Sequence, residues 1–170
     1  KDAVRWRKEA KLPEVVINNL EDFIRESKST MFRGIRSRDV SLFLDEVMPG
    51  LTAKVFRTYH ASNVVKASLD NSDVSQSTPD YLKKYVATMA NLGAAVVCNH
   101  KKKPMKNWRE SLRKKVERLK ELRGMKTKKS VERARILRVN IKIMKATKNY
   151  NLRTSLKSYI DPRIYYDWGK

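Results

Sequence analysis

The sequence has 170 residues, 41% of them hydrophobic, which suffices for one ordinary core with one or two small lobes. Its 39 Lys and Arg outnumber 18 Asp and Glu, and the net charge of +21 makes a polyanion, above all a nucleic acid, the natural partner. One cysteine excludes an internal disulfide framework, two histidines give no zinc-like cluster, and no apolar run approaches the roughly 20 residues of a membrane span.

The first part of the chain is predicted to form two helices after a short strand. The extreme start, KDAVRWR, alternates apolar and charged residues as a strand does. Pro13 opens a helix, and residues 31–36 form a loop around Gly34. Ser37 or Asp39 caps the next helix, which stops at Pro49-Gly50. The apolar stripes of these two helices consist of Val16, Leu20, Phe23, Ile24, Val40, Phe43, Leu44 and Val47.

Two longer helices are predicted next. Residues 51–69 form a helix that carries Arg57, and its apolar neighbours suggest that this helix is largely covered. The polar stretch 71–79 forms a loop in which Thr78 caps the following helix and Pro79 takes the first helical position. Residues 80–97 form a further apolar helix, which leads into the sequence VCNH.

The charge is concentrated in one stretch of the chain. Residues 101–149 hold 20 Lys and Arg against four Glu and so carry +16 of the net charge of +21. A helix is predicted from about residue 104 to 123, with Pro104 in its first turn and a break at Gly124. A second helix returns beside it, so the stretch forms an antiparallel hairpin that is cationic outside one apolar seam. The seam consists of Leu112, Val116, Leu119, Leu122, Val131, Ala134, Leu137, Ile141 and Met144.

Three residues carry groups that together suit phosphodiester chemistry. Tyr159 precedes Pro162, which ends any helix, so the tyrosine lies at a boundary where its side chain can be presented. By itself it is more often a core tyrosine with a satisfied hydroxyl. Arg57 on a covered helix needs a partner, usually a carboxylate and less often a phosphate. His100, at the end of an apolar run, is either a site residue or an ordinary helix cap.

These segments resemble the C-terminal half of eukaryotic-type DNA topoisomerase IB over nearly the whole chain. LTAKVFRTY and AS match the family's signature, and VCNH and the closing Tyr-hydrophobic-Asp-Pro-Arg-Ile follow in the same order. The 59 positions from His100 to Tyr159 hold a basic helical hairpin, as the family's linker does. Poxvirus enzymes and most tyrosine recombinases have a much shorter connection, and recombinases typically carry His-x-x-Arg where Lys54-Val-Phe-Arg57 stands. The opening KDAVRWR is similar to the family's GKDSIRYYN, so Lys1 corresponds to its catalytic lysine.

The resemblance implies a mainly α fold, namely the helical catalytic domain of the topoisomerase IB and tyrosine recombinase type with a protruding antiparallel hairpin. The expected parts are a partial catalytic core at 1–103, a linker at 104–148 and a C-terminal segment with the nucleophilic tyrosine at 149–170. By position, Tyr159 is the nucleophile, Arg57 and His100 bind the scissile phosphate, and Lys1 is the general acid. The expected DNA contacts are Lys54, Lys101, Lys102, Lys103 and Ser158.

The implied activity is the relaxation of supercoiled DNA through transient cleavage of one strand, a 3′-phosphotyrosine intermediate and religation. It needs neither ATP nor a metal, so no cofactor is expected. Two positions depart from the family's pattern, because His60 and Ser158 stand where asparagines are usual. Neither position is an assigned catalytic group, and Ser158 adjoins the cleavage site.

The implied partners are double-stranded DNA and an upstream part of the same enzyme, because the family's second arginine precedes the lysine. We expect a monomeric enzyme, and we expect these 170 residues alone to bind DNA but to nick it poorly. The charged start has no signal-peptide core, which indicates an intracellular protein on chromosomal DNA, in the nucleus of a eukaryote or in the cytoplasmic nucleoid of an archaeon.

Two other functions remain open at this point. A tyrosine recombinase uses the same chemistry but exchanges strands at a defined site with a partner protomer. A non-catalytic DNA-binding module would use the basic hairpin and would have no need of Tyr159.

Overall fold

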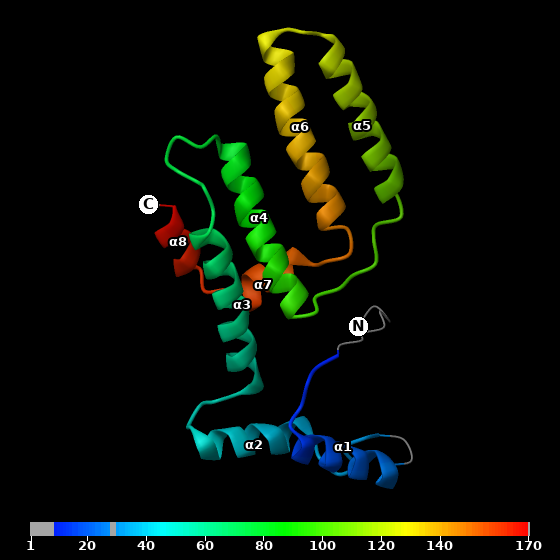
Figure 1. Ribbon diagram of the computed structural model, residues 1–170, viewed down its shortest axis with the longest axis vertical. Coiled ribbons are helices and arrows are strands. Elements are labelled where there is room, and N and C mark those ends of the chain that lie inside the picture. The colour runs from blue at the N-terminus through cyan, green and yellow to red at the C-terminus, as the bar shows by residue number, and fades with distance from the viewer. Residues whose placement is uncertain (1–8, 28–29, 170) are drawn as a thin grey trace. The chain divides into compact units, whose positions relative to one another are not determined.

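The structure is a computed structural model that describes residues 9–27 and 30–169. Over these ranges the chain is mainly helical, with eight helices and, outside them, one isolated antiparallel bridge between Lys101 and Tyr150 (Figure 1). The predicted mainly α fold is therefore confirmed. The strand predicted at KDAVRWR lies outside the described residues. Within the described ranges no helix combines the length and the apolar character that crossing a membrane requires.

The described residues form two compact units, 9–56 and 57–169. The first unit contains α1 (Glu14–Glu26), α2 (Ser37–Val47) and the start of α3 (Ala53–Asp70). The second unit contains the rest of α3 and five further helices. These are α4 (Asp80–Val97), α5 (Trp108–Gly124), α6 (Lys128–Ala146), α7 (Leu152–Ser158) and α8 (Arg163–Trp168).

In the first unit, the apolar stripes of α1 and α2 are present but largely exposed, and no residue of either helix is buried. The loop between them turns at Gly34, whose φ of 81° lies in the left-handed region. Asp39 caps α2, because its carboxylate accepts the Arg36 N–H at 2.7 Å. Ser37, the other predicted cap, is instead the first helical residue.

In the second unit, α3 and α4 contribute small residues to one core and come close together at one point. Ala61, Ala90 and Ala94 are fully buried between larger side chains. A Cβ added at Gly93 would lie only 3.0 Å from Val64 Cγ1, which shows how near the two helices come at that point. The cluster also includes Ile160, and the partly buried Tyr159 packs against it, so this core supports the segment that carries the predicted nucleophile.

The loop before α4 differs from the prediction. Pro79 is the N-cap residue of α4, and the helix proper begins at Asp80. Thr78 does not cap α4, because its hydroxyl accepts the Ser75 N–H at 2.9 Å and thereby closes the preceding turn. A threonine before a proline can satisfy a loop as well as a helix end, and here the loop bond forms.

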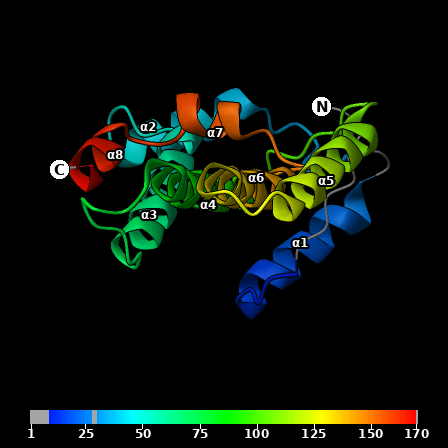
Figure 2. The same cartoon turned by 90° about the horizontal axis from the view of Figure 1, so that it is seen from above.

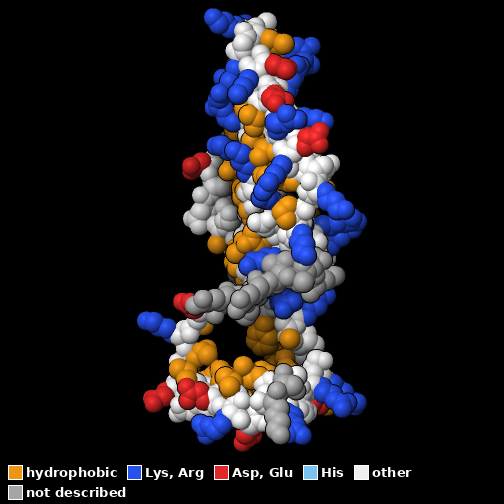
Figure 3. Space-filling view, turned by 90° about the vertical axis from the view of Figure 1, so that its right-hand side faces the viewer, with side chains coloured by type: hydrophobic (Ala, Val, Ile, Leu, Met, Phe, Trp, Pro, Cys, Tyr) orange, Lys and Arg blue, Asp and Glu red, His pale blue; other side chains and the backbone are white. Residues whose placement is uncertain are grey.

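Helices α5 and α6 form the predicted antiparallel hairpin, and α6 also packs along α4. From above, α3, α4 and α6 follow one another in a row, with α7 on one side of it (Figure 2). Leu122 and Ile141 are buried in the predicted seam. Figure 3 shows Lys and Arg side chains over the hairpin in the upper part of the view, with few acidic ones among them.

One detail of the hairpin was predicted wrongly. The helix begins at Trp108 and not near Pro104, because residues 105–107 form a turn and the Trp108 indole donates to the Met144 carbonyl at 3.3 Å. The break predicted at Gly124 is confirmed, since Gly124 is the last residue of α5, and the turn that follows has Lys126 in a left-handed conformation with a φ of 45°. Thr127 then caps α6 through the Ser130 N–H.

Candidate active site around Tyr159

Tyr159 lies where α7 ends, and its surroundings hold it in one position. Its φ of −138° takes the chain out of the helix, as the nearby Pro162 requires. The Ser62 hydroxyl donates to the Tyr159 carbonyl at 3.4 Å and accepts the Asp161 N–H at 3.1 Å. With Ile160 buried in the core, these bonds fix the turn, and the Tyr159 ring is left half-buried at the surface.

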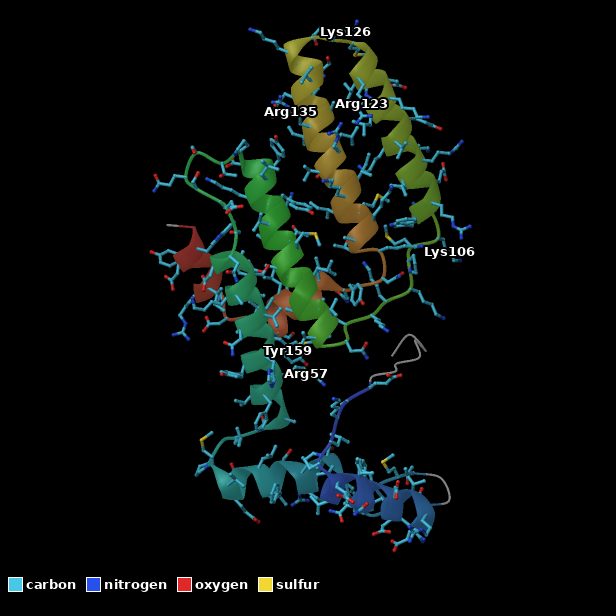
Figure 4. The ribbon with its side chains drawn as sticks, in the orientation of Figure 1. Arg57, Lys106, Arg123, Lys126, Arg135 and Tyr159 are labelled. Atoms are coloured by element: carbon cyan, nitrogen blue, oxygen red, sulfur yellow. The ribbon has the colours of Figure 1, made fainter. Side chains whose placement is uncertain are left out.

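Arg57 reaches Tyr159 from α3. Its Nη1 lies 3.4 Å from the Tyr159 hydroxyl, and its guanidinium carbon lies 5.5 Å from the ring centroid (Figure 4). The prediction of a largely covered helix holds only for the part of α3 after Arg57, since Ala61 and Val65 are buried whereas the Arg57 side chain is exposed. In the part of the chain that the structure describes, no carboxylate forms an ion pair with Arg57. Its charge therefore stays available to an anion at the surface.

His100 is placed by the way α4 ends. Asn99 adopts a left-handed φ of 52°, the Asn99 N–H bonds to the Val96 carbonyl at 3.0 Å, and the His100 N–H bonds to the Ala95 carbonyl at 2.8 Å. This is a Schellman motif, in which asparagine tolerates the left-handed position. The sequence VCNH thus encodes a helix end that directs the histidine toward α7.

The His100 ring lies beside Tyr159, with ring centroids 5.1 Å apart. Its Nδ1 is 2.8 Å from the hydroxyl of Ser155, a residue of α7 that is fully buried. Burial, with a smaller effect from the positive charge of Arg57, lowers the pKa of His100 below its ordinary value of 6.5. The imidazole is accordingly neutral near pH 7 and can act as a hydrogen-bond donor without adding a charge.

The chain entering the hairpin and the chain leaving it are joined beside His100. The Asn151 N–H donates to the His100 carbonyl at 2.7 Å, and the Lys102 N–H donates to the Asn149 carbonyl at 2.8 Å. The Asn91 side chain, itself 7% exposed, donates to the Leu152 carbonyl at 3.1 Å. The start of α7 is thereby held against the end of α4, which sets the position of Tyr159 relative to His100.

The remaining predicted residues lie in varied places. Lys1 is outside the described residues. Lys54 is exposed in the first turn of α3 and belongs to the other unit. The run from Lys101 to Lys103 follows His100, with its first two side chains half-buried and the third exposed, and Ser158 is exposed next to Tyr159.

Sequence reasoning missed three supporting residues, namely Ser62, Asn91 and Ser155. A serine in a helix carries no signal by itself, and its bond partner here lies tens of residues away in the chain. One indication was available for Ser155, since it precedes Tyr159 by four residues and shares its helical face. The buried Cys98 belongs to the core, and burial raises the pKa of its thiol, so it takes no part in the site.

Comparison with known proteins shows the family of the chain. The family model of the eukaryotic DNA topoisomerase I catalytic core matches residues 1–135. The whole chain aligns with DNA topoisomerase 1 of Drosophila melanogaster at 33% identity over 190 residues and covers 19% of that protein. It aligns over 205 residues with human DNA topoisomerase 1 at 28% identity and covers 26% of that protein. It also aligns over 205 residues with rat mitochondrial DNA topoisomerase I at 30% identity and covers 34% of it.

The helical fold and these matches together identify the chain as part of a topoisomerase catalytic core. The chain belongs to the eukaryotic DNA topoisomerase I family. It spans about a fifth to a third of the length of these relatives, so the activity of a whole enzyme is a matter for proposal.

Proposed function

We propose that this chain carries the strand-cleaving residues of a type IB DNA topoisomerase, which relaxes supercoiled DNA through a 3′-phosphotyrosine intermediate. One observation carries the proposal: the Tyr159 hydroxyl lies 3.4 Å from the Arg57 guanidinium, and the neutral His100 ring stands 5.1 Å from the tyrosine ring. The three residues come from α3, the end of α4 and the end of α7. The proposed nucleophile and the two proposed phosphate-binding donors therefore lie together at the surface, with Arg57 exposed and the other two half-buried.

In the cleavage step the Tyr159 oxygen attacks phosphorus in line, gives up its proton to solvent and forms a bond to the 3′-phosphate. Negative charge grows on the non-bridging oxygens as the bond to the 5′ oxygen lengthens. Donors already aimed at that place stabilise this charge, and removing one such donor typically costs about 10²–10³-fold in rate. Arg57 suits the task because its guanidinium stays protonated and has no carboxylate partner in the described part of the chain.

The departing 5′ oxygen needs a proton, because an alkoxide is a poor leaving group near neutral pH. We assign this task to Lys1, which donates its proton to the 5′ oxygen as that bond breaks. A general acid contributes about 10²–10⁴-fold to such a step. Religation is the reverse reaction: the 5′-hydroxyl attacks the phosphotyrosine and Tyr159 leaves. The energy of the broken bond is kept in the adduct, so the reaction needs neither ATP nor a metal.

The hairpin serves the step between cleavage and religation. While one strand is open, the downstream duplex turns about the intact strand. Each of the four glutamates between 101 and 149 pairs with a cation of its own helix, three or four residues away, so most of the cations there remain available for phosphates. Contacts of Lys and Arg with phosphates are independent of sequence and slow the rotating duplex. Lys54, Lys101, Lys102, Lys103 and Ser158 are the proposed contacts near the break.

The parts predicted at 1–103, 104–148 and 149–170 remain our proposed division into core, linker and tyrosine segment. The proposed partners are double-stranded DNA and an upstream portion of the same enzyme that carries a further arginine. The exposed apolar faces of α1 and α2 support such a protein partner, because contiguous exposed apolar residues usually mark a surface that another part of a protein covers. We propose a monomeric enzyme that works on chromosomal DNA, in the nucleus if the source is eukaryotic.

The proposal is tested with the full-length protein on a nicked suicide duplex, from which the short downstream fragment with the new 5′-hydroxyl dissociates after cleavage. The expected product is a covalent protein–DNA adduct linked to a 3′ end. Tyr159→Phe removes the nucleophile and keeps the ring, so it should form no adduct. Tyr166→Phe, at an exposed tyrosine of α8, is the matched control and should form the adduct at the native rate.

The outcome also separates the alternatives. Absence of an adduct in the native protein, or an adduct that persists in Tyr159→Phe, would falsify the catalytic proposal and leave a DNA-binding module. Dependence on one defined sequence, with strand exchange between two duplexes, would indicate a recombinase. Relaxation of supercoiled plasmids of unrelated sequence supports the topoisomerase.

A further inference from the structure

The bond between His100 and Ser155 is a partly buried polar contact beside Tyr159, and the mechanism above does not use it. The Ser155 side chain is fully buried, and its Oγ lies 2.8 Å from Nδ1 of His100. Its only other described acceptor is the Asn151 carbonyl one turn earlier, at 3.5 Å. A hydroxyl has one proton to donate, and the Asn151 carbonyl lies at the far limit of a hydrogen bond, so we assign that proton to Nδ1 of His100.

The ring has two nitrogens, and only one of them carries a proton when the imidazole is neutral. His100 is neutral near pH 7, because burial and the nearby Arg57 disfavour the imidazolium and lower its pKa. If Nδ1 accepts the Ser155 proton, Nε2 must carry the ring proton. Nε2 makes no hydrogen bond among the described residues, so it is the ring atom left to donate to a phosphate.

We infer that Ser155 is a positioning residue: its hydroxyl donates to Nδ1 of His100 and thereby holds the ring beside Tyr159 in the tautomer that presents an Nε2–H donor. The inference rests on the proposed function of His100 as a ligand of the scissile phosphate. It also gives a function to Ser155, which lies four residues before the proposed nucleophile. The same helix that presents Tyr159 also sets the tautomer of the donor beside it, so both groups move together.

The backbone reinforces this arrangement. The His100 carbonyl accepts the Asn151 N–H at 2.7 Å, directly before the helix that contains Ser155. Asn151 also caps that helix, because its side chain accepts the Thr154 N–H at 3.3 Å. His100 is thus fastened to α7 through its main chain and through its ring. A hydrogen-bond donor that must be placed precisely needs such support from neighbouring residues.

The first test reads the ring directly and does not depend on activity. In the full-length protein with ¹⁵N-labelled histidine, the His100 signals are assigned by their loss in His100→Gln. Above the pKa of the ring, the native protein should show Nε2 protonated and Nδ1 as an acceptor. Ser155→Ala should weaken that preference, whereas Thr154→Ala should leave it unchanged, because the Thr154 hydroxyl makes no hydrogen bond among the described residues. A native ring protonated at Nδ1 overturns the inference.

The second test measures the rate of adduct formation on the suicide duplex in single-turnover conditions. We expect Ser155→Ala to slow cleavage about tenfold, less than the loss of a whole donor, because the ring remains but is free to turn. In a His100→Gln background, whose neutral amide donates without help from Ser155, the same change should have no further effect. An equal loss in both backgrounds would mean that Ser155 acts through the general structure of α7, and the inference fails.

The two failures can be told apart. A native protein that forms no adduct overturns the proposed function and with it the catalytic meaning of this bond. An adduct that forms at the native rate in Ser155→Ala overturns this inference alone. Thermal melts followed by circular dichroism show whether each variant is folded, and alanine is well tolerated in a helix interior.

Discussion

The Tyr159 site, made of Arg57, Ser62, His100, Ser155 and Tyr159, and the α5–α6 hairpin belong to one unit but are built in different ways. The site joins residues 55 to 102 positions apart through single, well-defined hydrogen bonds. The hairpin is held by one apolar seam and by exposed ion pairs between residues three or four positions apart. Such pairs contribute about 0.3–0.5 kcal/mol each, so they are easily exchanged.

The difference separates chemistry that needs geometry from binding that needs charge. A displacement of about 1 Å at a reacting group can cost 10²-fold in rate. Attraction to phosphates, by contrast, is spread over many cations and tolerates movement. Changes at the Tyr159 site should therefore alter the cleavage rate, and changes in the hairpin should alter the salt dependence of DNA binding.

The largest effect is expected for Arg57→Ala. This change removes the only cation that the structure places against the Tyr159 hydroxyl among the described residues. We expect cleavage of the suicide duplex to slow by about 10²–10³-fold, the usual cost of one donor to a developing oxyanion. Lys66→Ala, at an exposed cation of the same helix that pairs with Asp70, is the control and should cleave normally. Equal rates for native protein and Arg57→Ala would remove Arg57 from the site.

The second prediction concerns the charge of the hairpin. Glutamine is introduced at exposed cations with no described carboxylate partner: Lys106, Lys115, Lys120, Arg123, Lys126 and Lys128. The slope of log affinity against log salt should fall by about 0.9 for each phosphate that the protein no longer neutralises, while the suicide adduct still forms. The control exchanges Lys and Arg at the same positions, which keeps the charge and should keep the slope. An unchanged slope in the glutamine variant would show that the hairpin lies away from DNA.

The third prediction tests the turn that presents the nucleophile. Ser62→Ala removes the hydroxyl that bridges the Tyr159 carbonyl and the Asp161 N–H. We expect the free energy of unfolding to decrease by about 1 kcal/mol, because neutral hydrogen bonds at one hydroxyl are removed. Cleavage should slow by up to about tenfold, since the tyrosine then samples more positions. Ser68→Ala, at an exposed serine of the same helix, should change neither quantity. If Ser62→Ala cleaves at the native rate, the bridge is not needed for positioning.

These expectations bear on what the sequence alone could predict. Helix positions followed from apolar spacing and from proline and glycine, and residues 80–97 match α4 from end to end. Local signals gave wrong predictions at residue types that occur both in loops and at the start of helices. Thr78 closes a loop where a helix cap was predicted, and α5 begins at Trp108 although Pro104 was predicted in its first turn.

The Tyr159 site was predictable only through resemblance. Nothing in the spacing of Arg57, His100 and Tyr159 says that α3, α4 and α7 meet, because their contact depends on the core beneath them. The exposure of Arg57 was missed because its apolar neighbours were counted as covered, yet Val55 is 44% and Phe56 48% exposed. Ser62 has no distinctive pattern and Ser155 has only its spacing of four residues from Tyr159, so the partners of these serines in space are what indicate their function.

The fourth prediction uses the pH dependence of stability. The pKa of His100 is lowered in the folded protein from 6.5, so the unfolded chain binds this proton at a higher pH than the folded chain does. The free energy of unfolding should therefore decrease as the pH falls through 6.5, until the folded pKa is reached. His100→Gln should remove this part of the decrease, as measured by thermal melts across that range. His60→Gln, at an exposed histidine, is the control. An identical pH dependence in native protein and His100→Gln would contradict a lowered pKa.

The smallest effect is expected at the tip of the hairpin. Lys126 holds a left-handed φ of 45° without the freedom of glycine, a conformation that costs a non-glycine residue about 1 kcal/mol. Lys126→Gly should relieve this strain and raise the free energy of unfolding by up to about 1 kcal/mol, reduced by the greater entropy of glycine in the unfolded chain. Because the tip makes no contact with the Tyr159 site, the cleavage rate should stay unchanged. Lys128→Gly, inside the first turn of α6, should instead lower the free energy of unfolding by about 0.5–1 kcal/mol. Both changes remove one lysine charge, so changes of opposite sign in the free energy of unfolding would show that backbone conformation and not charge decides the result.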